Sequence, residues 1–353
     1  MSAPVRFGLV GYGKGGQRFH APLIASTPGC ELSAVVTTSP QRREMLAAEH
    51  PGVAVFDDLA AMASAGVVDA VAISTTADSH VPLVVEALRS GLPVVCDKPF
   101  ALDSRSAAET IALADELGIP LSVYQNRRWD SDVLTVRAAL DSGRLGRLQR
   151  LESHIEQYAP PKGIPDSGGG ILLDLGSHVV DQALLIAGPV ASVYAELDHL
   201  DASVENPVCR FELALCHVGG TRSHVVGDLA LHGRPGPRFR VFGTEGTLEV
   251  PAFDGQAEIL MAGGSPVSEG DAWGVVPRER WARLHVGTTT TEFESLRGDW
   301  REFYAGFAAA VRGGAPVPVD PRDSLAGLLV LEAARRSALT GEVERLEVVR
   351  GGG

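Results

Sequence analysis

The stretch Val5–Gly16, VRFGLVGYGKGG, decides the fold of this chain. It begins as an apolar run typical of a buried strand and continues directly into closely spaced glycines. Gly11 permits a tight turn after the strand, Gly13 lets backbone amides approach a pyrophosphate, and Gly16 allows close packing of a helix on the strand. A glycine motif alone also occurs in ordinary turns, so the surrounding pattern has to decide.

The surrounding pattern alternates short apolar strands with helical segments from the N-terminus to about residue 124. This alternation predicts a parallel sheet with helices on both faces. The glycine loop after the first strand makes residues 1–124 a doubly wound, dinucleotide-binding Rossmann domain. The six predicted strands are Val5–Val10, Glu31–Thr37, Val53–Phe56, Ala70–Ser74, Pro93–Cys96 and Leu121–Tyr124.

Residues 125–353 predict a second, α+β domain. We expect a helix at 130–142, a strand at 148–158, a glycine hinge at 168–170 and a helix through Leu184. The following strands lack intervening helices, so they predict a large, open and mainly antiparallel sheet. Helices at 299–312 and 321–340, a strand near 346–349 and a loose loop at 263–271 complete the domain. The sheet strands are Val190–Leu197, Val208–Cys216, His224–Leu231, Phe239–Gly243 and Thr247–Val250.

The charge balance of 31 basic against 44 acidic residues gives a formal charge of −13, which argues against nucleic acid and membrane surfaces as partners. The cysteines are scattered without a CxxC pair, so we expect neither a disulfide framework nor a structural metal. The N-terminus leads directly into a strand, and no stretch of about 18 apolar residues is evident. We therefore expect a cytoplasmic protein.

The segment after the second strand, Thr37–Arg43, bears on the choice of cofactor. An acidic side chain there would hydrogen-bond the ribose hydroxyls of NAD, and this segment has none. Its hydroxyl and guanidinium groups could instead hold a 2′-phosphate, although a solvated polar loop is the plainer alternative. We expect NADP(H), with NAD(H) as the other possibility.

Polar side chains also follow the fourth and fifth strands, at the edge where open α/β sheets bind ligands. Lys98 comes directly after a buried strand, where a lysine either meets a partner or emerges into solvent. The expected cofactor-binding residues are Gly11, Gly13, Lys14, Gly15, Gly16, Thr37, Thr38, Ser39, Arg42, Ser74, Thr75, Thr76, His80, Asp97 and Lys98.

The densest polar signal of the second domain lies in the helix after the glycine hinge. At 3.6 residues per turn, Asp174, His178 and Asp181 share one face of that helix. A carboxylate one turn from an imidazole can orient it and raise its basicity, as a general base requires. A metal site would need a further ligand, so none is expected. The alternative is a helix cap with a satisfied core histidine.

Together, the glycine loop, Asp97-Lys98-Pro99 and Gly168-Gly169-Gly170…Asp174…His178 resemble the glucose-fructose oxidoreductase/inositol dehydrogenase/rhizopine catabolism family, and Tyr124–Asp130 resembles its scyllo-inositol dehydrogenase-like branch. The resemblance implies an active site between the two domains and oligomerisation, as a homodimer or homotetramer, through the C-terminal sheet. It also implies that His178 is the general base, Asp174 its orienting partner and Lys98 the cation that binds the reacting oxygen. Asp97 replaces the family's usual glutamate.

The resemblance implies hydride transfer between the nicotinamide cofactor and a secondary alcohol of a cyclic polyol or sugar. Two other functions stay open: a regulator that binds NAD(P) without turnover, and a glycosidase that works through transient oxidation. The residues expected to contact the substrate are Asn126, Arg127, Trp129, His154 and Tyr158.

Overall fold

The computed structural model describes residues 3–158, 170–199 and 208–347. They form two compact units, and neither is a single stretch of chain. Unit 1 comprises residues 1–129, 255–273 and 299–325, and unit 2 comprises residues 130–254, 274–298 and 326–353. This differs from the expected division at residue 124. The physical reason lies in α11 (Arg301–Val311), whose aromatic residues Phe303, Tyr304 and Phe307 are part of the same buried cluster as Phe7 of β1.

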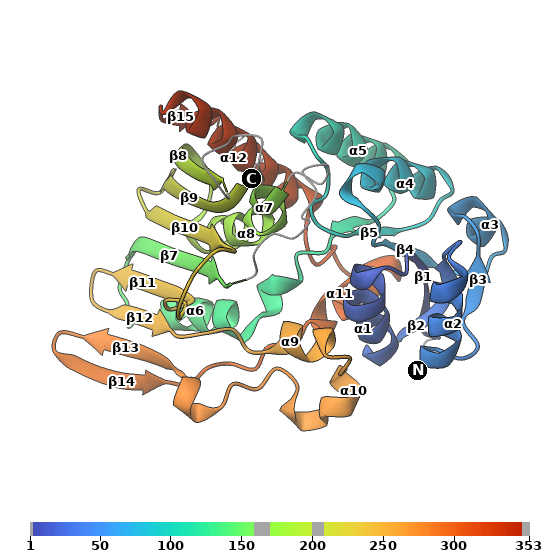
Figure 1. The fold of residues 1–353 in the computed structure, drawn as a ribbon, viewed down its shortest axis with the longest axis horizontal. Helices are drawn as coiled ribbons and strands as arrows, with labels where there is room; N and C mark the ends of the chain where they lie inside the picture. The colour runs from blue at the N-terminus through green and yellow to red at the C-terminus, as the bar shows by residue number, and fades with distance from the viewer. Residues whose placement is uncertain (1–2, 159–169, 200–207, 348–353) are drawn as a thin grey trace. The chain divides into compact units, whose positions relative to one another are not determined.

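Unit 1 contains a six-stranded, all-parallel sheet in the order β3-β2-β1-β4-β5-β6, which confirms the predicted Rossmann fold. Helices flank it, as Figure 1 shows in blue and teal. Thr37, Ser74 and Tyr124, which were expected inside strands, each lie just beyond a strand end. The strands are β1 Val5–Val10, β2 Cys30–Val36, β3 Ala54–Phe56, β4 Ala70–Ile73, β5 Val94–Cys96 and β6 Leu121–Val123.

Several helices of unit 1 begin at side-chain caps. The side chains of Ser39, Asp58 and Asp103 accept hydrogen bonds from the first turns of α2, α3 and α5. The expected loose loop at 263–271 instead contains a short helix, α10, with a capping box from Ser265 to Ser268. The helices are η1 Gly16–His20, α1 Ala21–Ser26, α2 Pro40–Glu49, α3 Leu59–Ser64, α4 Ala77–Arg89, α5 Ser104–Leu117, η2 Asn126–Trp129, α9 Gln256–Met261, α10 Pro266–Glu269, η4 Gly270–Ala272 and α11.

Unit 2 contains a nine-stranded sheet in the order β14-β13-β12-β11-β7-β10-β9-β8-β15. It is mostly antiparallel, as expected, but β10 pairs with β7 in parallel. The hairpin β13–β14 was not predicted, because its largely exposed, threonine-rich second strand gives little apolar alternation. The strands are β7 Leu148–Glu156, β8 Val190–His199, β9 Val208–His217, β10 Arg222–Asp228, β11 Phe239–Gly243, β12 Thr247–Val250, β13 Ala282–Val286, β14 Thr289–Phe293 and β15 Glu344–Arg345.

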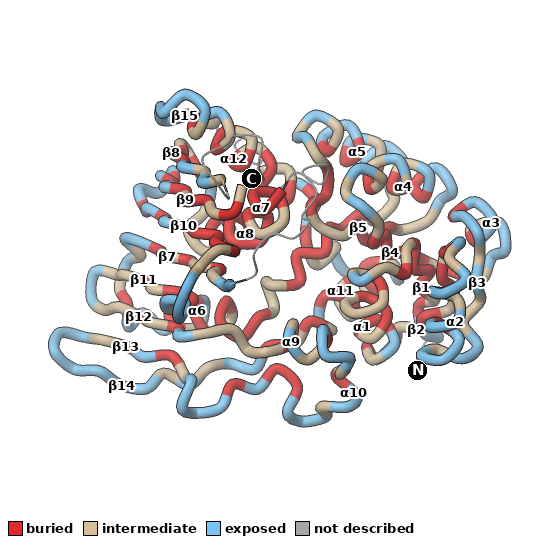
Figure 2. The backbone as a smooth tube through the Cα atoms, viewed as in Figure 1, coloured by how far each residue is buried: buried red, intermediate tan, exposed pale blue. Residues whose placement is uncertain are grey.

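One face of the unit 2 sheet packs against α8, which is almost entirely buried over its first two turns (Figure 2). Gly176 lets Leu331 of α12 approach, since a Cβ there would lie 2.9 Å from its Cδ2. Residues 170–187 are apolar and long enough to span a membrane by composition, but 67% of this segment is buried inside the protein, which identifies it as core. The other helices are α6 Ser131–Asp141, α7 Gly170–Asp174, α8 Gly176–Ala187, η5 Arg278–Arg280 and α12 Pro321–Thr340, which begins in unit 1.

Candidate functional site

The glycine loop of unit 1 is tight toward the sheet and open on its other side. Gly11 has a positive φ of 98°, and a Cβ there would lie 2.4 Å from the Ser74 carbonyl oxygen. A Cβ on Gly16 would lie 2.1 Å from the Gly11 carbonyl oxygen. Around Gly13, by contrast, the nearest atom to such a Cβ is 3.8 Å away, on Arg42. The loop therefore leaves a cradle in front of a helix N-terminus, which fits a dinucleotide pyrophosphate.

The two arginines of the segment after β2 have different surroundings. Arg43 forms an ion pair with Asp57 (Nη2 to Oδ1, 2.5 Å) and donates Nε–H to the Thr37 carbonyl oxygen at 3.0 Å. Ser39 caps α2. Arg42 is exposed, its guanidinium lies near Gly13, and no ion pair of Arg42 is found within the described residues. Arg42 is therefore the arginine available to a phosphate.

The carboxylate of Asp97 fixes the corner after β5. Its Oδ1 accepts the Lys98 backbone N–H at 2.8 Å, and its Oδ2 accepts the Ser74 hydroxyl at 2.9 Å. His20 Nε2 lies 3.1 Å from the same Oδ2. Burial alone would raise the pKa of Asp97, but the nearby His20, Lys98 and His80 outweigh it and hold that pKa well below its usual range. Asp97 is thus an anchored anion at the carboxyl edge of the sheet.

His80 clamps the same corner from α4. Its ring is buried, with Nδ1 2.8 Å from the Pro99 carbonyl oxygen and Nε2 3.2 Å from that of Thr75. Thr75 also accepts the Ser79 hydroxyl at 2.7 Å, and Thr76 is the residue before α4. The Lys98–Pro99 peptide bond is cis. His80 therefore holds the Lys98 loop against the start of α4, a role that the sequence did not reveal.

In unit 2, Asp174 and His178 lie on consecutive helices rather than on the one uninterrupted helix expected. α7 ends at Asp174 and α8 starts at Gly176, with Leu175 between them. The backbone continues through the break, since Leu175 N–H donates to Ile171 and His178 N–H to Leu175. His178 is 7% exposed in the first turn of α8, and Asp174 is half-buried. Gly168 and Gly169 lie outside the described residues.

A buried ion pair lies next to α8, and no pattern in the sequence indicates it. Arg238 Nε lies 3.0 Å from Asp132 Oδ2, and both side chains are at most 1% exposed. Arg238 also donates to Ser153 Oγ of β7 at 2.7 Å and to Gln182 Oε1 of α8. Gln182 stands one turn after His178, so this cluster fixes the helix segment that carries the imidazole. In the sequence, Arg238 looks like any surface arginine.

The remaining predicted substrate residues are distributed over both units. In unit 1, Asn126 is buried, Arg127 Cζ lies 5.7 Å from the Trp300 ring centroid, and the Trp129 ring meets Phe303 edge-on at 5.8 Å. These contacts give Arg127 and Trp129 packing roles within their unit. Cation–π and aromatic contacts of this kind stabilise a core with or without a ligand.

In unit 2, the register of β7 turns His154 away from α8. Ser153 contacts Arg238 on the α8 face, and successive strand residues point to opposite faces. His154 therefore lies on the opposite face, 3.8 Å from Glu156, with its pKa lowered chiefly by burial. His154, expected from the sequence to contact the substrate, therefore does not share the sheet face that packs against α8. Tyr158, beyond the strand, is 60% exposed and lies 4.7 Å from the ring of His232.

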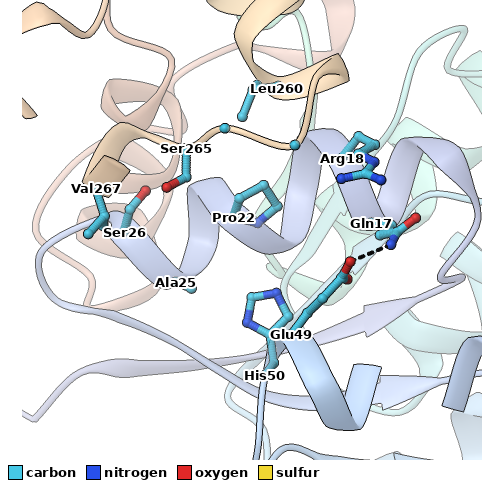
Figure 3. Close-up of a pocket in the computed structure, with 12 residues that line it drawn as sticks. Gln17, Arg18, Pro22, Ala25, Ser26, Glu49, His50, Leu260, Ser265 and Val267 are labelled. Atoms are coloured by element: carbon cyan, nitrogen blue, oxygen red, sulfur yellow. Dashed lines mark hydrogen bonds between the residues drawn. The ribbon is translucent and has the colours of Figure 1, made fainter. Parts of the chain in front are cut away.

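A pocket of about 340 Å³ in unit 1 is lined by η1 and α1, the end of α2 and residues 260–267 (Figure 3). At one end, Gln17 donates to Glu49 at 2.7 Å, and the Tyr12 hydroxyl donates to the same carboxylate at 2.7 Å. The pair ties the glycine loop to the end of α2. No cluster of three or more potential metal-ligating His, Cys, Asp or Glu residues occurs in the described part of the chain.

Comparisons with known proteins agree with these observations. The family model described as "Oxidoreductase family, NAD-binding Rossmann fold" matches residues 5–125, and the "GFO/IDH/MocA C-terminal domain" model matches residues 133–249. The oxidoreductase YdgJ of Escherichia coli, which is itself uncharacterised, is 33% identical over 96% of this chain and 97% of its own. The scyllo-inositol 2-dehydrogenase (NADP(+)) IolW of Bacillus subtilis is 28% identical over 95% and 94%. A solved structure described as an oxidoreductase from Yersinia pestis superimposes with a TM-score of 0.91 at 32% identity and covers 99% of both chains.

Proposed function

Because this chain belongs to the GFO/IDH/MocA family of oxidoreductases, we propose that it interconverts a secondary alcohol and a ketone on a cyclic polyol or sugar, using NADP(H). The chain is an NAD(P)-binding oxidoreductase whose relatives include inositol and sugar dehydrogenases. The observation that carries the proposal is the position of Lys98 and Asp97, directly after β5 and beside Ser74. A Cβ on Gly15 would lie 2.6 Å from Ser74 Oγ and 3.4 Å from Asp97 Oδ2, so the corner adjoins the glycine loop.

The preference for NADP(H) rests on the segment after β2. It offers no carboxylate to the ribose hydroxyls, and Arg42 is exposed beside Gly13. Thr37, Thr38 and Ser39 add hydroxyls near the same strand end. The name of the relative IolW specifies NADP(+), which supports this choice. Held by the glycine loop, a nicotinamide cofactor would supply the hydride acceptor or donor.

The protein's own residues handle the proton and the reacting oxygen. In oxidation, the Lys98 ammonium binds the substrate oxygen and stabilises the negative charge that develops on it. The imidazole of His178 accepts the hydroxyl proton, and Asp174 orients that imidazole. Reduction reverses these steps. Asn126, Arg127, Trp129 and Tyr158 stay as proposed contacts to the hydroxyls and rings of the substrate, while His154 is better placed on the far face of the unit 2 sheet.

That far face supports the proposal of a homodimer or homotetramer. It carries alternating charges that pair along and across strands, as Arg150 with Glu152, Arg240 with Glu152, and Arg210 with Glu212. A patch with both signs interspersed can meet a second copy of itself across a twofold axis. Light scattering of the purified protein at several salt concentrations tests this. A monomer at every concentration would contradict it. We also propose a cytoplasmic location, because the four cysteines are free.

The decisive experiment titrates the protein with NADPH and NADH by fluorescence and then offers NADP+ with a panel of inositols, sugars and glycosides. We expect tighter binding of NADPH and a net rise in reduced-nicotinamide absorbance with at least one polyol. Tighter binding of NADH would overturn the cofactor choice. Release of sugar without net absorbance change would indicate a glycosidase, and binding without any turnover would indicate a regulator.

A further inference from the structure

A buried histidine in unit 1 has no part in the proposed reaction, yet it touches the residue that anchors Lys98. His20 ends η1, one turn after the glycine loop, and its side chain is 0% exposed. An imidazole so deeply buried needs partners for both ring nitrogens, because an unpaired polar atom in a core is costly. Its partners come from the end of β5 and from α11, two segments far apart in the sequence.

The contacts of His20 determine which ring nitrogen accepts a hydrogen bond and which carries the proton. Its Nδ1 lies 2.6 Å from the Tyr304 hydroxyl, and its Nε2 lies 3.1 Å from Asp97 Oδ2. Burial raises the pKa of Tyr304 well above its usual value, so this phenol keeps its proton and can donate it to Nδ1. The proton of the neutral ring is then on Nε2, which lies within ion-pair distance of the carboxylate but outside hydrogen-bond geometry. The ring of Tyr124 packs against the imidazole at 4.3 Å and fixes its plane.

We propose that His20 is a positioning residue: together with Tyr304 it holds the Asp97 carboxylate in place, and Asp97 in turn fixes the backbone and the charge environment of Lys98. The inference rests on the proposed role of Lys98 in binding the reacting oxygen. Each link is a direct contact, from Tyr304 to His20, from His20 to Asp97 and from Asp97 to the Lys98 backbone N–H at 2.8 Å. The Asp97 carboxylate lies 3.1 Å from His20 Nε2.

The arrangement also has an electrostatic consequence. Asp97 is faced by His20 from η1, by His80 from α4, by the Ser74 hydroxyl after β4 and by Lys98 beside it. With His20 present, the negative charge of the Asp97 carboxylate interacts with several groups at once. Without His20, the carboxylate loses one of these polar partners, and the Lys98 ammonium remains beside it. The pKa of Lys98 should therefore rise when His20 is removed. The charged ammonium would then face a carboxylate that interacts with fewer other groups, which stabilises the ammonium.

The sequence makes this measurable, because Lys14, Lys98 and Lys162 are the only lysines of the chain. Reductive methylation with 13C-formaldehyde labels them while keeping their charge, and Lys98→Arg assigns the Lys98 signal. NMR titrations then give the Lys98 pKa in wild type, His20→Phe, His20→Gln and Tyr304→Phe. His50→Gln is the matched control, since His50 is half-buried at the end of α2 and contacts neither Asp97 nor Tyr304 in the described structure.

We expect His20→Phe to raise the Lys98 pKa by about half a pH unit, because the carboxylate beside the ammonium loses one of its polar partners. His20→Gln keeps an amide donor and should recover most of the wild-type value, Tyr304→Phe should give a smaller rise, and His50→Gln should give none. An unchanged or lowered Lys98 pKa in folded His20→Phe overturns the proposal. Should that variant not fold, no rise in Tyr304→Phe relative to the control does the same.

Activity separates this inference from the proposed function. If wild type oxidises no polyol, the proposed function fails, while the lysine titrations still decide the role of His20 because they need no substrate. If wild type is active, His20→Phe should lower kcat about tenfold or more and leave NADPH affinity within about threefold, since the effect is on the transition state. A loss confined to NADPH binding would instead place His20 in support of the glycine loop and overturn the positioning role.

Discussion

The Ser74 hydroxyl, just beyond β4, donates to the Asp97 carboxylate, just beyond β5, over 2.9 Å. This bond joins the carboxyl ends of two neighbouring parallel strands directly beside the glycine loop. It places a carboxylate, a hydroxyl and the backbone of Lys98 at the edge where such sheets bind their ligands.

The charge on Asp97 should contribute to stability in a defined pH range. Its folded pKa lies well below its usual value, so the stabilising contribution is complete above the unfolded pKa of about 3.9 and is lost as the pH falls toward the folded value. Asp97→Asn should therefore be less stable than wild type at pH 6, and the difference should shrink below about pH 4. Urea unfolding at several pH values measures it. A difference that grows toward acid pH would contradict the assignment.

Filling the cradle at Gly13 should remove cofactor binding without unfolding the protein. In Gly13→Ala the new methyl meets no atom closer than 3.8 Å, so the melting temperature should stay within about 2 °C of wild type. NADPH affinity should fall at least about tenfold, because the methyl occupies the path by which backbone amides reach the pyrophosphate. Gly219→Ala, which also has open space, is the control. Undiminished NADPH binding in Gly13→Ala would show that the pyrophosphate lies elsewhere.

Two adjacent arginines provide a matched test of cofactor selectivity. Arg42→Ala should weaken NADPH binding by about tenfold and leave NADH binding nearly unchanged, as one charge-assisted contact to a 2′-phosphate would give. Arg43→Ala should change the NADPH-to-NADH ratio by less than about twofold, since Arg43 is engaged by Asp57 and Thr37. Fluorescence titration of both cofactors measures the ratio. Equal losses for both cofactors in Arg42→Ala would refute the phosphate contact.

The catalytic assignment predicts a specific pattern in kinetics. Lys98→Met and His178→Ala should each lower kcat by about a hundredfold or more, while NADPH still binds. If both groups act on one transition state, the double variant should be less impaired than the product of the two single effects. Steady-state rates with the best polyol substrate give all three numbers. Near-normal turnover in either single variant would remove that residue from the mechanism.

The buried pair beneath α8 should dominate the stability of unit 2. Arg238→Gln removes the cation that pairs with the fully buried Asp132 carboxylate and should cost about 3–5 kcal/mol in the free energy of unfolding. Arg240→Gln breaks an exposed pair with Glu152 on the neighbouring strand and should cost less than about 1 kcal/mol. Denaturant unfolding of both variants compares them directly. Equal costs would mean that the buried pair stabilises the protein no more than the exposed pair does.

Much of unit 1 could be predicted because local signals and the global fold agree there. Each of the six strands was found to within a residue or so of its observed bounds, since strand alternation and glycine turns are local properties. The division of the chain was harder. Residues 255–273 and 299–325 belong to unit 1 because the aromatic residues of α11 pack in its core. The sequence of α11 does not indicate which sheet it packs against.

By itself, the sequence determined the Rossmann fold and the family. It also determined the glycine loop, the lysine and the histidine that the proposed function uses. Each of these signals is a short motif of residues close together in the chain. Only the tertiary structure decided which arginine is available to a phosphate, which face of β7 carries His154, and that Asp97 is held by His20 and Tyr304. These relationships join residues up to 284 positions apart, so they depend on register and packing, which no local pattern specifies.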